Sequence, residues 1–284
     1  MTPTITTAQT RRRRRLDSVN AASRGSSRAS SRSVSRSGRH ERRPLALVTG
    51  ATSGIGLAVA HDLAHDHDLI LLARTASDLE DLARLLHRET GCLVTTCAVD
   101  LTLDTDLAQA IAELDVESLD VLVHSAGVEG PGVVEGLSPA RWRDVLDLDL
   151  VAVAHLTSLL LPAVRDAQGL VVFINSGAGQ HSWPGQALYS AAKHGLVALA
   201  DALREEERGQ VRVTSIYPGR VDTPMQKRLH RHAAPLTSSG RRRPYRARDH
   251  MRPGSVASCV RLAVSMPHDT IVEDLSVRPE KAGR

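Results

Sequence analysis

From Pro44 onward, short runs of hydrophobic residues alternate with longer stretches in which apolar residues recur at helical spacing. Such runs, rich in valine, leucine and isoleucine, are typical of buried parallel strands, and the stretches between them are typical of amphipathic helices. The expected strands are residues 45–49, 69–73, 93–99, 121–125, 170–175, 211–216 and 270–277. The expected helices are residues 54–66, 76–89, 103–114, 138–165, 187–208 and 255–266. This alternation predicts one α/β domain, residues 44–284, with a doubly wound parallel sheet of about seven strands and helices on both faces.

The first 43 residues lack this pattern. They contain twelve arginines and nine serines but only two acidic residues, Asp17 and Glu41. Without enough apolar surface to offset the entropy of ordering, residues 1–43 are expected to be a disordered tail. A secretory leader is disfavoured because no apolar segment follows the arginines. A nucleic-acid-binding arm is disfavoured because no aromatic residue is interleaved among them for base stacking. A dispensable tail is the favoured interpretation.

This tail also carries the positive charge of the chain. Its net charge of +10, against +4 for the whole sequence, leaves the remainder at −6, the balance of an ordinary acidic enzyme. No run of about 18 apolar residues is present to span a membrane. The three cysteines, Cys92, Cys97 and Cys259, fit no metal-ligand spacing and predict reduced thiols. We therefore expect a cytoplasmic protein with neither a metal site nor a membrane segment.

A glycine-rich turn joins the first expected strand to the first expected helix. Gly50, Gly54 and Gly56 lie in the segment TGATSGIG, where the absence of side chains lets backbone N–H groups approach a pyrophosphate. A purely structural tight turn is the alternative. The strand before the turn and the helix after it favour a dinucleotide site in a Rossmann fold.

The end of the second expected strand bears on the choice of cofactor. An acidic residue there would bind the 2′-hydroxyl of the adenosine ribose, whereas a basic residue would pair with a 2′-phosphate. Ala73 offers no carboxylate and Arg74 follows it directly. The sequence therefore favours NADP(H) over NAD(H), with a solvated arginine as the alternative.

A serine, a tyrosine and a lysine form the candidate catalytic group. Tyr189 and Lys193, at i and i+4 in YSAAK, share one face of an expected helix. An ammonium near the phenol would lower the tyrosine pKa from about 10 toward the working range of an acid or base. Ser176 follows the fifth expected strand, at the edge of the sheet where ligands bind, and could hydrogen-bond the substrate oxygen.

Together these segments resemble the short-chain dehydrogenase/reductase family over residues 44–280. TGATSGIG is similar to the family's TGxxxGIG turn, VDL at 99–101 to its adenine-binding segment, HSAG at 124–127 to its NNAG, and YPGRVDTP at 217–224 to its PGxxxT. The resemblance implies hydride transfer between nicotinamide and a carbonyl or secondary alcohol, with Ser176, Tyr189 and Lys193 at the reaction centre. It implies a cofactor site made of Gly50, Thr52, Ser53, Gly54, Ile55, Gly56, Arg74, Asp100, Leu101, Ser125, Ala126, Gly127, Tyr189, Lys193, Pro218, Gly219, Val221 and Thr223.

Two positions depart from the family pattern. Ser125 stands where the family has an asparagine that braces the strand. Asp149, seven residues after Trp142, stands where the family has another asparagine, whose side chain holds a water that links the catalytic lysine to solvent. By resemblance, Asp149 joins the catalytic group as part of a proton relay, although a carboxylate cannot donate a hydrogen bond as an amide does. A cofactor-binding regulator or sensor with an impaired relay is the alternative function.

The region between Met225 and Arg252 is basic and irregular, with nine Lys or Arg against one acidic residue. In the family, a mobile lid lies over the substrate here, so the excess charge suggests an anionic substrate, with a solvated lid as the favoured alternative. His155, His181 and His194 lie near the proposed site, where packing or surface roles are favoured over ligation. The apolar, two-sided helices at 138–165 and 187–208 suggest a homodimer or homotetramer.

Overall fold

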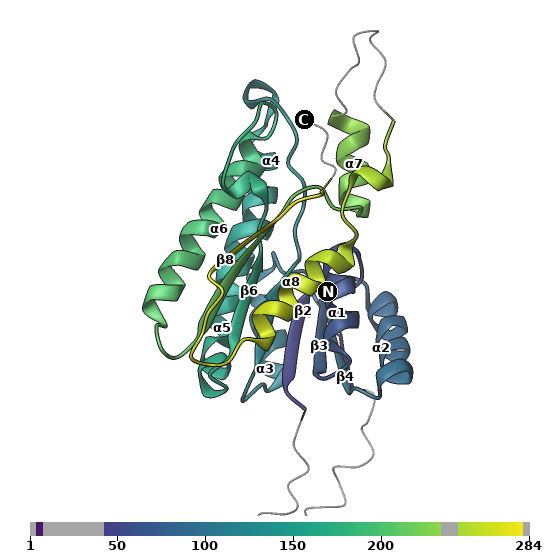
Figure 1. Ribbon diagram of the computed structural model, residues 1–284, viewed down its shortest axis with the longest axis vertical. Coiled ribbons are helices and arrows are strands. Elements are labelled where there is room, and N and C mark those ends of the chain that lie inside the picture. Colours follow the sequence, from purple (N-terminus) through teal and green to yellow (C-terminus); the bar gives the residue numbers. More distant parts are fainter. Residues whose placement is uncertain (1–3, 8–42, 234–243, 281–284) are drawn as a thin grey trace, which may run out of the picture.

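In the computed structural model, residues 4–7, 43–233 and 244–280 are described, and they form a twisted sheet covered by helices (Figure 1). The sheet has eight strands in the order β1-β4-β3-β2-β5-β6-β7-β8. All neighbouring pairs are parallel except β1 with β4. The strands are β1 (Thr4–Thr7), β2 (Leu45–Thr49), β3 (Asp68–Ala73), β4 (Val94–Ala98), β5 (Val121–His124), β6 (Leu170–Ile174), β7 (Arg212–Pro218) and β8 (Asp274–Val277). The predicted doubly wound α/β fold is confirmed.

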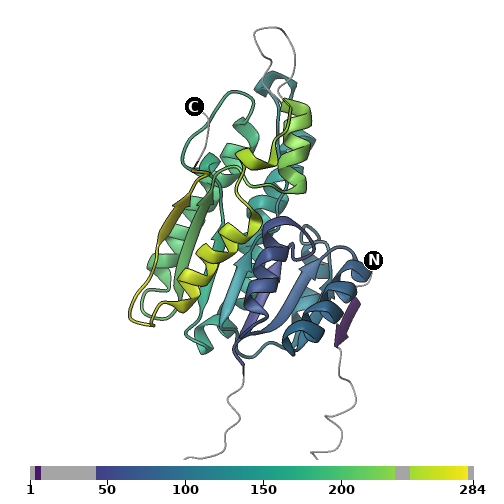
Figure 2. The ribbon, with the colours of Figure 1, turned by 45° about the vertical axis from the view of Figure 1, so that its right-hand side comes forward.

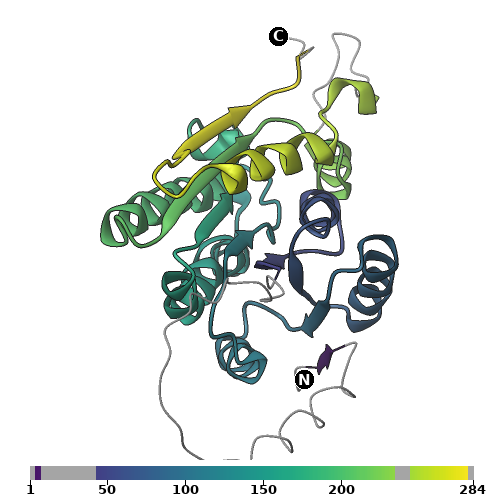
Figure 3. The same ribbon diagram turned by 60° about the horizontal axis from the view of Figure 1, so that its bottom comes forward.

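Helices cover both faces of this sheet, as the view along the strands shows (Figure 3). They are α1 (Gly54–Leu63), α2 (Ala76–Thr90), α3 (Asp104–Leu114), α4 (Pro139–Leu146), α5 (Ala152–Asp166), α6 (Ala187–Glu206), α7 (Pro224–Ala233) and α8 (Pro253–Ser265). Residues of α1, α2 and α8 share one apolar core with one face of the sheet, and residues of α3, α5 and α6 share a second core with the other face. The central strands are buried on both sides, which explains why they read as continuous hydrophobic runs.

Strand β1 lies within the N-terminal segment that was expected to be a disordered tail. Thr4–Thr7 pairs antiparallel with β4, Thr4 opposite Ala98, and forms the edge of the sheet (purple in Figure 2). The pairing is a local exception within the segment expected to be a tail; residues 1–3 and 8–42 lie outside the described part of the chain. Pairing satisfies the open hydrogen-bonding edge of β4, which a local sequence pattern does not reveal.

The long helix expected at 138–165 is interrupted. Between α4 and α5 the backbone adopts a π-helical turn over Asp147–Val151. Such turns occur frequently at functional sites because they redirect a side chain without ending the helix. Taken together, Pro139–Asp166 is long and apolar enough to cross a membrane by length and composition alone. However, Leu156 and Leu160 are buried in the core, as is typical of a central helix in a globular domain.

Helix α7 was not predicted, since the segment was expected to be irregular. Its sequence, PMQKRLHRHA, is mostly polar, and Met225 and Leu229, four residues apart on one face, are too few to stand out as a helical pattern. The start signal is nevertheless present: the Thr223 hydroxyl accepts a hydrogen bond from the backbone N–H of Gln226 at 3.1 Å, and Pro224 occupies the first helical position. Arg241, Arg242 and Arg243, which the anionic-substrate hypothesis invoked, lie outside the described residues.

His124, at the end of β5, makes the domain sensitive to acid. Its ring stacks on Phe173 with centroids 5.2 Å apart, and its Nε2 lies 2.9 Å from the Thr157 hydroxyl. Burial lowers the pKa of His124 to about 3, whereas the unfolded chain has an ordinary histidine pKa of about 6.5. Below pH 6.5 the unfolded state therefore binds more protons than the folded state, so stability is full above that pH and declines as pH falls toward 3.

When the pH is lowered from 7 to 5, we expect the free energy of unfolding to fall by about 2 kcal/mol because of His124 alone. Urea unfolding of wild type and His124→Asn at both pH values measures it, because asparagine does not titrate. The variant is expected to lose about 2 kcal/mol less than wild type over this interval, whatever its absolute stability. Equal losses in the two proteins would show that His124 is not held neutral by the fold.

Candidate active site

The carboxyl ends of the strands meet where the direction of winding reverses, between β2 and β5. In doubly wound sheets this crevice binds ligands. The turn after β2 is shaped by its glycines: Gly50 and Gly54 have φ angles of +64° and +55°. A Cβ on Gly50 would lie 2.9 Å from Ala126 Cα, and a Cβ on Gly56 would lie 2.4 Å from the Gly50 carbonyl oxygen. The turn thus requires glycine and forms a bare backbone cradle at the start of α1, which fits a dinucleotide pyrophosphate.

Thr49 connects this cradle to the neighbouring loop. The Thr49 hydroxyl is buried and accepts hydrogen bonds from the backbone N–H groups of Ser125 and Ala126, both at 3.0 Å. It thereby fixes the HSAG loop beside the glycine turn, although Ser125 replaces the asparagine found in the family. Sequence reasoning did not single out Thr49. Its position as the first residue of the TGATSGIG segment was the available signal.

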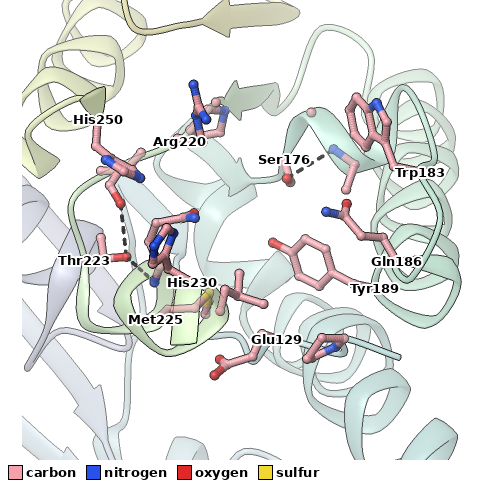
Figure 4. A pocket seen from close by; sticks show the side chains of 18 of the residues that line it. Glu129, Ser176, Trp183, Gln186, Tyr189, Arg220, Thr223, Met225, His230 and His250 are labelled. Atoms are coloured by element: carbon pink, nitrogen blue, oxygen red, sulfur yellow. Dashed lines mark hydrogen bonds between the residues drawn. The ribbon is translucent and has the colours of Figure 1, made fainter. Parts of the chain in front are cut away.

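Ser176 and Tyr189 come together in a cavity of about 1000 Å³. Figure 4 shows both hydroxyl groups directed into it, Ser176 from the turn after β6 and Tyr189 from the first turn of α6. The Ser176 hydroxyl is oriented by the backbone N–H of Ala178, from which it accepts a hydrogen bond at 3.2 Å. The volume of this cavity is at the upper end of the range for small-molecule pockets, which is roughly 300 to 1000 Å³.

Lys193 lies behind the tyrosine, with its Nζ 5.6 Å from the Tyr189 ring centroid. It is buried and forms an ion pair with Asp149, Nζ to Oδ2 at 3.2 Å. Asp149 is fully buried in the π-helical turn, and its Oδ1 accepts a hydrogen bond from the Val128 N–H at 2.8 Å. The carboxylate thus contacts the lysine directly, in contrast to the water-mediated relay expected from the resemblance.

The pKa of Tyr189 departs from the sequence-based expectation. Burial raises it, Lys193 and the hydrogen bond with Ser176 lower it, and Asp149 and Glu129 raise it, so that the net direction is upward. For Lys193, burial alone would lower the pKa, but the Asp149 carboxylate outweighs it and the pKa is raised. In this structure the lysine stays charged and the tyrosine stays protonated. The expected lowering of the tyrosine pKa below 10 is therefore wrong for the free protein.

The remaining predicted cofactor residues lie along the same edge of the sheet. Those that line the cavity are Ile55, Pro218, Gly219, Val221 and Thr223. The others lie in the turns that follow β2, β3, β4 and β5: Thr52, Ser53, Arg74, Asp100, Leu101, Ser125, Ala126 and Gly127. Together they trace a path from the cavity to the ends of β3 and β4, as an extended dinucleotide would require.

Two side chains on that path have contrasting environments. Asp100 closes a local turn, because its Oδ1 accepts hydrogen bonds from the backbone N–H and the hydroxyl of Thr102. Arg74 is exposed and has no side-chain partner among residues 4–7, 43–233 and 244–280. A guanidinium at the end of β3 is thus available to an anionic ligand.

Of the three histidines considered, only His181 lines the cavity, where its ring meets Trp183 edge-on. His155 lies 3.7 Å from Asp104, and His194 is bonded to the Ser190 carbonyl oxygen at 2.8 Å. Within the described part of the chain, no group of three or more His, Cys, Asp or Glu side chains could hold a metal ion.

Sequence reasoning missed the contacts that hold α7 over the cavity. Arg228 of α7 forms two hydrogen bonds with the Glu129 carboxylate, at 2.8 and 3.2 Å. Lys227 forms an ion pair with Asp222 at 3.1 Å. These pairs neutralise two of the nine cations on which the anionic-substrate hypothesis rested, and that hypothesis remains an untested prediction.

Comparison with known proteins places this geometry in a family. A family model described as short chain dehydrogenase matches residues 44–234, which include the glycine turn, Ser176, Tyr189 and Lys193. The chain belongs to the short-chain dehydrogenase family. It is therefore an oxidoreductase of the class that acts on CH–OH or ketone groups with NAD(P).

Several relatives of this short-chain dehydrogenase are reductases. A protein of Streptomyces virginiae, provisionally named as the ketoacyl reductase of the monensin polyketide synthase, is 37% identical over 193 residues, covering 65% of this chain and 73% of that protein. A solved variant of the actinorhodin polyketide ketoreductase with NADPH superposes with a TM-score of 0.75 at 29% identity, covering 85% of this chain and 98% of the other. An alcohol dehydrogenase from Thermococcus sibiricus, complexed with 5-hydroxy-NADP, gives a TM-score of 0.75 at 26% identity over the same shares.

Proposed function

We propose that this short-chain dehydrogenase is an NADP(H)-dependent carbonyl reductase in which Tyr189 is the general acid/base. The observation that carries the proposal is the meeting of Ser176 and Tyr189 in one cavity, with charged Lys193 behind them and the glycine cradle beside them. The sensor alternative was motivated by Asp149 and Ser125. It loses support because Asp149 has a direct ionic partner and the Ser125 backbone is held by Thr49.

The chain's own groups suffice for the proton chemistry. When bound, the nicotinamide supplies the hydride. The Ser176 hydroxyl donates a hydrogen bond to the substrate oxygen, where negative charge develops, and the Tyr189 hydroxyl donates its proton to the same atom. Lys193 stabilises the phenolate that remains, because its ammonium lies 5.6 Å from the ring centroid. In the oxidative direction, the phenolate removes the proton from the alcohol.

The cavity suggests a bulky, largely apolar carbonyl compound. Its mouth is formed partly by Val133 and Trp183, which are 65% and 50% exposed. Apolar side chains left in water at the entrance of a pocket favour a ligand with apolar surface. The named functions of the relatives, which include ketoacyl reductase and alcohol dehydrogenase, support a ketone or secondary alcohol.

The experiment is a turnover assay of the full chain with NADPH. Aliphatic, aromatic and thioester-linked ketones are supplied in turn, and NADPH oxidation is recorded against a control without ketone. At least one ketone series is expected to raise the rate well above that control. A complete panel without any ketone-dependent rate, on protein that binds NADPH, would contradict the proposed function.

The preference for NADP(H) is assigned to Arg74. Replacing Arg74 with alanine is expected to raise KM for NADPH by about 10- to 100-fold, the range of a lost charged hydrogen bond to phosphate, and to leave KM for NADH almost unchanged. Arg88→Ala is the matched control, because Arg88 is exposed in the last turn of α2 and far along the helix from the cofactor path. Equal changes in KM for both cofactors would refute the assignment.

We also propose that the enzyme is a homodimer or homotetramer. Val151, on the helical segment between α4 and α5, is 48% exposed although it is apolar, and Leu150 on the same turn packs against α6 at Gly195. The Leu150 contact is internal to the subunit, whereas Val151 leaves apolar surface in water that a second copy of the chain would cover.

A further inference from the structure

Asp149 is a buried carboxylate in the immediate surroundings of the proposed acid. It has no exposed surface, and its one ionic partner among the described residues is Lys193, at 3.2 Å. The resemblance to the family implies a neutral amide at this position. The substitution therefore places a negative charge in the interior of the site, where a charge acts more strongly than in water.

We propose that the Asp149 carboxylate offsets part of the Lys193 charge at Tyr189 and so favours the protonated tyrosine, which adapts the site to carbonyl reduction rather than alcohol oxidation. The inference rests on the proposed function for its consequence in turnover. Its electrostatic part concerns the free protein and can be tested without substrate or cofactor.

The packing of the π-helical turn fixes the carboxylate in place. A Cβ on Gly127 would lie 3.2 Å from Asp149 Oδ2, and a Cβ on Gly195 would lie 2.7 Å from Leu150 Cδ2. The HSAG loop and α6 therefore approach the turn closely from two sides. With Oδ1 held by the Val128 N–H, the carboxylate has little freedom to turn away from Lys193.

The charges that face Tyr189 do not favour a phenolate. Lys193 is the positive contribution, while Asp149 and Glu129 are negative. Glu129, on the loop after β5, is itself paired with Arg228 of α7. The charge of Arg141 on α4 is paired with Asp144, 3.9 Å away. The Ser176 hydroxyl, on the turn after β6, hydrogen-bonds Tyr189 but carries no charge. Asp149 is thus the negative group that acts most directly on the lysine, and its removal leaves the ammonium free to stabilise a phenolate.

Asp149→Asn is the decisive variant, because an amide keeps the shape and can still accept the hydrogen bond from Val128 N–H. The chain contains only three tyrosines, so their ionisation can be followed by phenolate absorbance. Burial raises the pKa of Tyr217 to about 12 and also raises that of Tyr245. The difference between each protein and its Tyr189→Phe counterpart isolates the titration of Tyr189.

In wild type, Tyr189 is expected to titrate at or above the ordinary value of about 10. In Asp149→Asn, it is expected to titrate about one pH unit lower, the size of effect that removal of one nearby buried charge produces. Asp147→Asn is the matched control: Asp147 is an exposed carboxylate in the same turn, and its loss should leave the titration unchanged.

Turnover provides the second measurement. The pH above which ketone reduction declines is expected to fall by about one unit in Asp149→Asn, and alcohol oxidation near pH 8 to rise by up to about tenfold. A wild-type Tyr189 that titrates well below 9, or an Asp149→Asn titration identical to wild type, would overturn the inference. If Asp149→Asn does not fold, the titration of Tyr189 in the wild-type protein still tests the inference by itself. If the titrations are as expected but no ketone is reduced, the proposed function fails instead.

Discussion

Replacing Lys193 with methionine is expected to lower kcat by about 1000-fold and to destabilise the protein by about 3 to 5 kcal/mol. The catalytic loss follows because the phenolate left by proton donation loses the ammonium behind it. The loss of stability follows because Asp149, which has no exposed surface, is left without its ionic partner at 3.2 Å. Steady-state kinetics with NADPH and urea unfolding measure the two effects on the same preparation.

A double variant separates these two effects. Lys193→Met combined with Asp149→Asn removes both charges and keeps an acceptor for the Val128 N–H. It is expected to regain most of the lost stability, because an unpaired buried charge costs more than a missing pair, but to regain none of the activity. If the single variant is as stable as wild type, the buried ion pair does not exist in solution. If the double variant recovers activity, Lys193 has no role in proton donation.

Gly56→Ala is expected to weaken NADPH binding by about 100-fold or more. The added methyl group would lie 2.4 Å from the Gly50 carbonyl oxygen, which belongs to the backbone and can move only if the turn itself moves. Loss of one or two backbone hydrogen bonds to a charged phosphate, each worth about 1.5 to 3 kcal/mol, gives a factor of this size. Fluorescence titration with NADPH gives the dissociation constant directly.

The matched control for that variant is Gly254→Ala, in the first turn of α8. A Cβ at Gly254 meets no atom within 4 Å, and its φ angle is not in the left-handed region. Alanine there should leave NADPH binding unchanged and add up to about 1 kcal/mol of stability through its higher helix propensity. Unchanged NADPH affinity in Gly56→Ala, with the fold intact, would show that the turn does not hold the cofactor.

The parallel sheet could be predicted from the sequence because its strands are buried on both faces. Strands β2 to β7, such as Leu45–Thr49 and Leu170–Ile174, therefore stand out as apolar runs whose bounds are correct to within about two residues. The last strand, expected at 270–277, is Asp274–Val277 and is only partly buried. Elements at the periphery of the domain could not be predicted from local sequence patterns. Strand Thr4–Thr7 owes its conformation to pairing with β4, and the start of α7 is fixed by the Thr223 cap.

The site could be predicted as a set of positions but not as an electrostatic environment. The order of the motifs along the chain identified Ser176, Tyr189 and Lys193. In the fold, Ser176 and Tyr189 line one cavity and Lys193 lies behind Tyr189. Spacing alone could not show that Asp149 touches Lys193, because that contact depends on a π-helical turn and on the close approach of α6. Nor could it show the direction of the Tyr189 pKa, which burial and neighbouring charges decide together.

The most direct test of the account compares wild type with Tyr189→Phe, which removes one hydroxyl group from the cavity. NADPH oxidation with a reducible ketone and NADPH binding are measured on both proteins. We predict that kcat falls by about 100- to 10,000-fold, the range for loss of a general acid, while the dissociation constant for NADPH changes little. Equal ketone-dependent rates in the two proteins would contradict the central claim that Tyr189 donates the proton.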